Sequence, residues 1–128
     1  DFEYIVTSED LPIGFSMLLS NNQNTIFSSF DNHIQHDWSN QPLHEKGHFV
    51  NSCYIPGNML NEGVHSINLW CYSPPLNPNS APHIKLLETL SFRVVDNYFG
   101  DSARGSFPYS WTTLPTTRPK LKWRKIKV

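Results

Sequence analysis

Apolar and polar side chains alternate with a period of two along most of the chain, which is the pattern of β-strands with one buried face. The alternation is strongest over residues 64–72, where Ile67, Leu69 and Cys71 occupy one face. No segment shows a sustained period of 3.6, so no long helix is expected. The same alternation predicts further strands at 2–6, 15–20, 48–55, 87–95 and 121–128, with a hairpin partner for 15–20 resuming at Ile26.

Residues that break regular structure separate these runs. The chain has 10 Pro and 6 Gly, and turn signals fall at 21–24, 56–58 and 73–82. Residues 31–47 have no clean period and predict a loop or a ragged edge strand, and residues 59–63 predict a turn. Six to eight short strands at this spacing predict a single all-β domain over residues 1–128, an antiparallel β-sandwich of the immunoglobulin-like or jelly-roll kind.

Charge is distributed unevenly along the chain. Six of the ten Lys and Arg residues lie in 118–128, which contain no acid, whereas residues 1–117 carry four bases against eleven acids. Such asymmetry is typical of a tail that has a partner. The 38% hydrophobic and 13% aromatic content supports a folded core. No apolar run approaches the ~20 residues that span a bilayer.

The two cysteines, Cys53 and Cys71, are too few for a disulfide scaffold. A hairpin that turns near residue 60 would pair the strand at 48–55 with the strand at 64–72 and would place Cys53 opposite residue 66 or 67. The cysteines are then not cross-strand neighbours. Free, buried thiols are expected, which suits a reducing compartment.

Motifs with catalytic chemistry are weak in this chain. Residues 44–48 match H-E-x-x-H, whose two His bind zinc when a helix places them one turn apart. Here Pro42 precedes the motif, Gly47 lies inside it and a β-run begins at His48, so the two His are expected ~13 Å apart. The His residues of 33–37 are interpreted as polar loop residues. No metal and no cofactor are expected, and a small metalloenzyme built on 33–48 is kept as an alternative.

Other catalytic signatures do not change this expectation. No nucleophile-elbow or phosphate-loop motif is present, so the chain is not expected to be an enzyme. The stretch 100–105, G-D-S-A-R-G, predicts a turn held together by an Asp and an Arg. An anion site made by its backbone amides is the alternative.

The aromatic residues carry a stronger signal. If Ile67 and Leu69 face the core, then Trp70 and Tyr72 face outward, with Tyr54 outward on the neighbouring strand. Exposed aromatic rings among amides and hydroxyls suit a sugar, because a ring packs on the C–H side of a pyranose while polar side chains bond its hydroxyls. Packing of these rings on a second sheet, a loop or a dimer partner is an equal alternative. The candidate glycan contacts are Tyr54, Asn68, Trp70, Tyr72 and Arg93, joined by Trp38 and His36 from the adjoining loop.

Three blocks of sequence, taken in chain order, carry a resemblance to one family of domains. The blocks are 53–69 (C-Y-I-P-G-N-M-L-N-E-G-V-H-S-I-N-L), 90–96 (L-S-F-R-V-V-D) followed by 100–105, and Arg118-Pro119 with Leu121-Lys122-Trp123. They are similar to the C-terminal carbohydrate-binding domains of the ATP-binding subunits of polysaccharide ABC transporters, the Wzt-like O-antigen exporters. The likeness covers residues 48–128, although His65 stands where the family has Tyr and 107–117 is longer and richer in Thr and Pro.

The resemblance implies a β-sandwich that binds the non-reducing end of an undecaprenyl-linked, O-antigen-type polysaccharide and couples completion of the glycan to export. It implies a homodimer that exchanges its C-terminal strand, next to nucleotide-binding and membrane subunits at the cytoplasmic face of the bacterial inner membrane. The chain would then be the excised C-terminal part of a larger ATPase subunit, soluble as an isolated domain. The shared blocks look structural, with Gly63 in a turn, Phe92 and Val94 in the core and Trp123 as an anchor, so they do not place the sugar site.

Alternatives from other classes stay open. One is a structural dimerisation module whose exposed aromatics form the interface. Nucleic-acid binding is not expected, because apart from Trp123 the basic tail has no interleaved aromatic platform. The lysines of the basic tail alternate with apolar residues, as in an edge strand that is protected from unwanted pairing.

Overall fold

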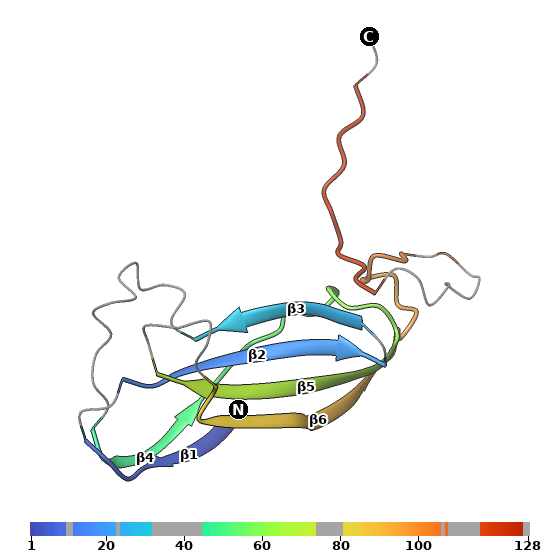
Figure 1. Cartoon of the computed structure of the whole chain (residues 1–128). Coiled ribbons are helices and arrows are strands. Elements are labelled where there is room, and N and C mark those ends of the chain that lie inside the picture. Colours follow the sequence, from blue (N-terminus) through green and yellow to red (C-terminus); the bar gives the residue numbers. More distant parts are fainter. Residues whose placement is uncertain are drawn as a thin grey trace.

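The computed structural model of the protein describes residues 1–9, 12–22, 24–31, 45–73, 81–105, 107 and 116–126. Within these residues the chain forms six β-strands and no helix, and every strand pairing is antiparallel (Figure 1). The predicted all-β class is therefore confirmed. A helix long and apolar enough to cross a membrane is absent from the described ranges.

The strands form two sheets of unequal size. The smaller sheet pairs β1 (Phe2–Val6) with β4 (Gly47–Asn51). The larger sheet has the order β3-β2-β5-β6 and contains the predicted hairpin β2–β3. Its strands are β2 (Gly14–Asn21), β3 (Asn24–Phe30), β5 (Gly63–Tyr72) and β6 (Ile84–Val94).

The predicted hairpin between 48–55 and 64–72 is wrong. β4 ends at Asn51 and pairs with β1, while β5 lies between β2 and β6. Residues 52–56 form no strand and connect the two sheets, because Pro56 has no N–H to donate to a ladder and the turn at 57–58 follows at once. Both cysteines are free, and Cys71 is buried as expected, whereas Cys53 is exposed, contrary to the prediction.

The core lies on the face of the larger sheet that we call the inner face, defined by the buried β2 residues Phe15, Met17 and Leu19. The register places Cys71, Leu69 and Ile67 of β5 opposite these residues, on the same face. Across the gap between the sheets, the Phe15 ring lies 4.8 Å from that of Phe2 and 4.6 Å from that of Tyr4, centroid to centroid. This aromatic cluster joins the two sheets and stabilises them through apolar burial.

The C-terminal segment departs from its predicted strand. Residues 121–126 are extended but pair with no strand of the described chain, and they point away from the sheets (Figure 1). We call residues 119–126 the tail. An extended segment becomes a strand only when another strand bonds its N–H and C=O groups, and none lies beside the tail.

Candidate functional site

The outer face is the face of the larger sheet opposite the inner one, and side chains reach it because they alternate with core residues. Ser16 of β2 lies between the buried Phe15 and Met17, and it is opposite Trp70 of β5. This face faces away from the smaller sheet, since the smaller sheet packs on Phe15. Its register positions on β2, β5 and β6 include four Ser, one Leu, one amide, two aromatic rings and two bases: Ser16, Leu18, Ser20, Ser66, Asn68, Trp70, Tyr72, Lys85, Ser91 and Arg93.

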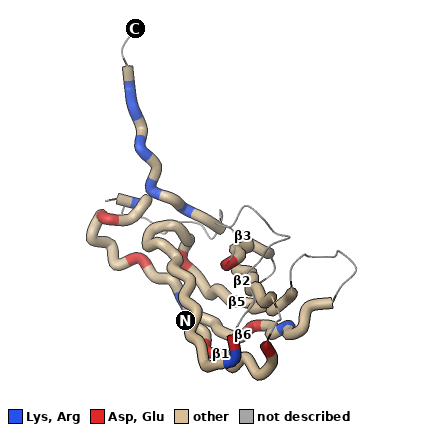
Figure 2. Tube along the Cα trace, turned by 90° about the vertical axis from the view of Figure 1, so that its left-hand side faces the viewer, with Lys and Arg blue, Asp and Glu red and all other residues tan. Residues whose placement is uncertain are grey.

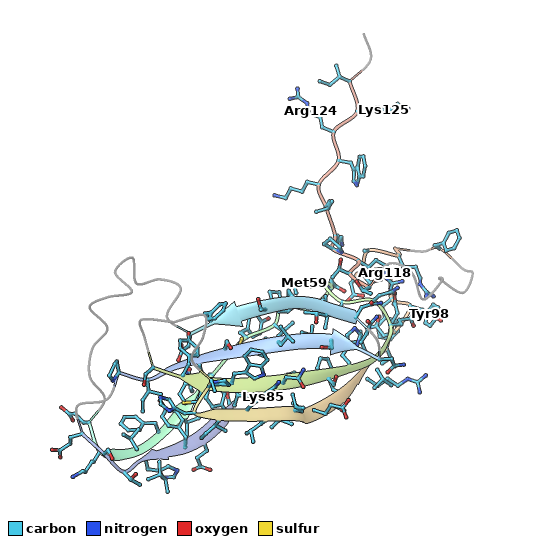
Figure 3. The ribbon with its side chains drawn as sticks, viewed as in Figure 1. Met59, Lys85, Tyr98, Arg118, Arg124 and Lys125 are labelled. Carbon is cyan, nitrogen blue, oxygen red and sulfur yellow. The ribbon has the colours of Figure 1, made fainter. Side chains whose placement is uncertain are left out.

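Trp70 and Lys85 form the central contact of the outer face. They are register partners on β5 and β6, and the Lys85 ammonium lies 5.1 Å from the centroid of the indole ring. This is the geometry of a cation–π interaction. The Trp70 ring is half-buried, and its Nε1 is covered by protein without a hydrogen-bond partner. Figure 3 shows the Lys85 side chain beside β6.

Asn68 has a structural role that the sequence did not indicate. Ile67 and Leu69 are opposite Leu90 and Leu86, so three β6 residues face the single residue Asn68 and form a bulge. Asn68 Oδ1 accepts a 2.7 Å hydrogen bond from the backbone N–H of Glu88, the residue at the centre of the bulge. The Nδ2 hydrogens of Asn68 and the second lone pair of its Oδ1 are then left to contact a ligand.

Tyr72 lies on the outer face, but its expected exposure is wrong, since only 6% of it is accessible. Its ring lies 6.1 Å from that of Phe30, edge on, and covers Gly14. A Cβ at Gly14 would lie 2.9 Å from the Tyr72 ring carbons, so this position has room only for glycine. Tyr72 therefore packs against Phe30 and Gly14 and offers little surface to a ligand.

Tyr54 is separated from the outer face. It lies in the connection 52–56, is 85% exposed and borders a cavity of about 330 Å³. The cavity is lined by inner-face residues, among them Phe15, Met17 and Leu69. The prediction that Tyr54 and Trp70 share one face is wrong, because it assumed that β4 and β5 are neighbours.

The remaining predicted contacts have different outcomes. Arg93 is exposed on the outer face, opposite Val64. Trp38 and His36 lie outside the described residues, as does His44 of the H-E-x-x-H motif. His48 is on β4, as the β-run predicted, and its Nε2 lies 2.6 Å from Glu3 Oε1. No group of three metal-ligating side chains occurs in the described ranges.

A second feature is a buried group of charges where the tail leaves the sheets. We call it the tail anchor, and its members are Glu62, Asp96, Ser102, Arg104 and Arg118. Arg104 Nη2 donates to Glu62 Oε2 at 2.5 Å, and its Nε lies 3.5 Å from Asp96 Oδ2. Arg118 Nη2 lies 3.8 Å from Glu62 Oε2 and 3.7 Å from Asp96 Oδ2. Two guanidinium groups thus balance two carboxylates, as buried charges require.

Backbone hydrogen bonds also fix the segment immediately before the tail. Arg118 N donates to Met59 O at 2.9 Å, and Asn61 N donates to Thr116 O at 3.1 Å. Figure 3 places Met59, Arg118 and Tyr98 together at the end of the sheet, with Arg124 and Lys125 far out along the tail. The Tyr98 ring lies 4.4 Å from the Arg104 guanidinium carbon. The anchor therefore sets the direction in which the tail leaves.

The electrostatics of the anchor are centred on Asp96. Its carboxylate accepts a 2.7 Å hydrogen bond from Ser102 Oγ and a 2.9 Å hydrogen bond from Tyr98 N. These bonds, followed by the charges of Arg104 and Arg118, hold the pKa of Asp96 below its ordinary value of 3.8, although burial acts in the opposite direction. The group is arranged to stay ionised and paired.

Sequence reasoning found part of this arrangement. The turn at 100–105 does involve an Arg and an Asp, but Arg104 pairs with Asp96 and Glu62 instead of Asp101. Glu62 and Asp96 were missed because each is an isolated acid. Glu62 directly precedes Gly63 and Asp96 lies two residues after Val94, and Gly63 and Val94 are register partners at the end of β5 and β6. Lys85 was missed because its position over Trp70 depends on the register.

The three sequence blocks that carry the resemblance meet in the tail anchor. Glu62 comes from the first block, Asp96 and Arg104 from the second and Arg118 from the third. Comparison of the chain with protein-family models, with curated proteins and with solved structures gives no match.

Proposed function

We propose that this chain is a non-catalytic carbohydrate-binding module whose outer face contacts the glycan. The observation that carries the proposal is Trp70, a half-buried ring at the centre of a sheet face whose other register positions include four Ser, together with Asn68 and Arg93. An aromatic platform ringed by hydroxyl and amide groups matches the apolar and polar faces of a pyranose.

The finer fold assignment is part of the proposal. The two sheets pack through the cluster of Phe2, Tyr4 and Phe15, and they are the two layers of an immunoglobulin-like or jelly-roll β-sandwich. The smaller sheet covers one part of the inner face. Ile84, Leu86 and Leu90, on the inner face of β6, remain exposed. The second layer is therefore completed by another segment.

That segment is the tail of a second copy. Trp123 is 92% exposed and Leu121 and Ile126 are also exposed, so the tail presents apolar side chains that its own chain does not bury. Figure 2 shows its Lys and Arg positions in sequence along the segment, away from the strands. The exposed edge of β6 and its apolar side chains offer both backbone groups and burial to such a strand. The acidic excess of residues 1–117 complements the basic tail.

The proposed role in a transporter comes from the resemblance, and one structural observation supports it. Residues from all three resembling blocks meet in the tail anchor, so the blocks form one structural unit, which makes the resemblance more specific than three separate segments would. We propose that the glycan is an undecaprenyl-linked, O-antigen-type polysaccharide, recognised near its non-reducing end. The domain would act beside nucleotide-binding and membrane subunits at the cytoplasmic face of the bacterial inner membrane.

A binding titration against purified bacterial O-polysaccharides, with and without their terminal residue, tests the proposal. Trp70→Ala should abolish binding while the circular dichroism spectrum is kept. Tyr54→Ala is the matched control, because Tyr54 is an exposed aromatic away from the outer face. Unchanged affinity of Trp70→Ala would remove the outer face as the site. A dimer that binds none of the polysaccharides would support the structural dimerisation module instead.

A further inference from the structure

The four strands of the larger sheet carry more bases than acids, whereas residues 1–117 as a whole carry more acids than bases. They contain a single carboxylate, Glu88, against two bases, Lys85 and Arg93. Residues 1–117 as a whole carry eleven acids against four bases. Both bases of the sheet lie at outer-face register positions, opposite Trp70 and Val64. The outer face is therefore the part of the acidic body where positive charge gathers.

Neither of these two bases is paired with a carboxylate of the described residues, although Lys85 contacts the Trp70 ring. The other two bases of residues 1–117 have carboxylate partners, since Lys46 Nζ lies 3.6 Å from Glu9 and Arg104 lies in the tail anchor. Among the described residues, no carboxylate lies within ion-pair distance of Lys85 or Arg93. Their charges are available to an anionic ligand.

The position of Lys85 restricts what can stack on Trp70. Its ammonium lies 5.1 Å from the indole centroid, over the ring. A neutral sugar must displace this cation to reach the ring and gains nothing in exchange. A sugar that bears a carboxylate or phosphate can draw the ammonium to its own anionic group and stack on the uncovered indole.

The spacing of the two bases fits a chain of sugars. Val64 and Trp70, their partners on β5, are six residues apart, which is ~20 Å along a strand. Between them lie Ser66 and Asn68 of β5 and Ser91 of β6, which can bond sugar hydroxyls. The bulge residue Glu88 also lies between the two bases, so the seam carries two bases against one acid. From the charges, the free bases and this spacing, and resting on the proposed glycan-binding function, we infer that the outer face binds an anionic polysaccharide along the β5–β6 seam.

The test compares each acidic probe with its neutral form. Trigalacturonate is paired with its methyl ester and mannose 6-phosphate with mannose, and binding is followed by NMR through the Trp70 indole N–H of the full chain. The acidic probes should bind roughly tenfold more tightly than the neutral ones, and Lys85→Met with Arg93→Met should remove that difference. Lys46→Met is the control base, and Lys120, Lys122, Arg124 and Lys125 changed together to Gln show whether the tail contributes.

Four outcomes are distinguishable. Selective binding of an acidic probe that is lost in the Lys85→Met, Arg93→Met protein supports the inference, and the better probe separates carboxylate from phosphate. Equal binding of neutral and acidic probes overturns it and leaves glycan binding at this face intact. Acidic binding that survives those changes but is lost in the Gln-substituted tail also overturns it. No shift of the Trp70 signal with any probe overturns both this inference and the proposed function.

Discussion

Asn68 Oδ1 accepts the backbone N–H of Glu88 at 2.7 Å, and this bond holds a bulge in β6. Glu88 has a φ of 49°, in the left-handed region that residues other than glycine rarely adopt. A bulge bends the strand and interrupts its free edge. Another chain can therefore pair with β6 only along the residues before the bulge or along those after it. One of the candidate glycan contacts thus also shapes the edge on which dimerisation is proposed.

The bulge predicts an unusual pattern of substitutions at Glu88. Glu88→Gly should be close to neutral, because relief of left-handed strain of about 1 kcal/mol offsets the entropy cost of glycine. Glu88→Val should lower the free energy of unfolding by about 1 kcal/mol or more, since a branched side chain fits this conformation poorly. Asn68→Ala should cost about 1 kcal/mol. Urea unfolding measures all three, and equal stability of the Gly and Val variants would argue against the left-handed conformation.

The tail anchor predicts a loss of stability in acid. The folded pKa of Asp96 lies below its ordinary value of 3.8, so its carboxylate stabilises the fold at pH above 3.8. That contribution is lost as the pH falls through the folded pKa. Asp96→Asn should be less stable than the wild type at neutral pH, and the difference should shrink in acid. A stability difference that is independent of pH would show that the ionised form of Asp96 is not what matters.

The two thiols should differ in reactivity. Cys53 is exposed, whereas Cys71 is buried, and burial together with the Asp31 charge raises the pKa of the Cys71 thiol. Since the thiolate is the reacting species, Cys71 should label slowly until the protein unfolds. A thiol-reactive dye should therefore titrate one cysteine per chain under native conditions, and none in Cys53→Ser. Rapid labelling of Cys53→Ser would contradict the burial of Cys71.

Leu19 should be the most sensitive core position of β2. It is fully buried between Phe27 of β3 and Ile67 of β5. Leu19→Ala should lower the free energy of unfolding by about 2–5 kcal/mol, through lost burial and the cavity left behind. Val50→Ala, at an exposed position of β4, is the control and should change stability by less than about 0.5 kcal/mol.

The proposed strand exchange predicts that the tail determines the oligomeric state. Deletion of residues 119–128 should convert a dimer into a monomer in analytical ultracentrifugation. Trp123→Ala with Leu121→Ala should weaken the dimer, because these are the exposed apolar side chains that a partner would bury. Val95→Ala, at an exposed apolar position outside the tail, is the control. A truncated chain that remains dimeric would rule out exchange of this segment.

The amino-acid sequence by itself determined the all-β class and most strand positions. The alternation over 64–72 also placed Ile67 and Leu69 on the face opposite Trp70, as the structure has them, because the side-chain period of a strand is a local property. The turn at 56–58 could also be predicted from the sequence, because Pro56 and Gly57 end a strand whichever strand it pairs with.

Only the tertiary structure decided which strands are neighbours, and several site predictions depended on that. The pairing of β4 with β1 moved Tyr54 off the face of Trp70, and Phe30 buried Tyr72. Lys85 reached the indole through the β5–β6 register, and Arg104 reached Glu62 from 42 residues away in the chain. Alternation specifies a face but not a partner, because any strand can satisfy another's backbone groups and only the packing of the whole core selects among them.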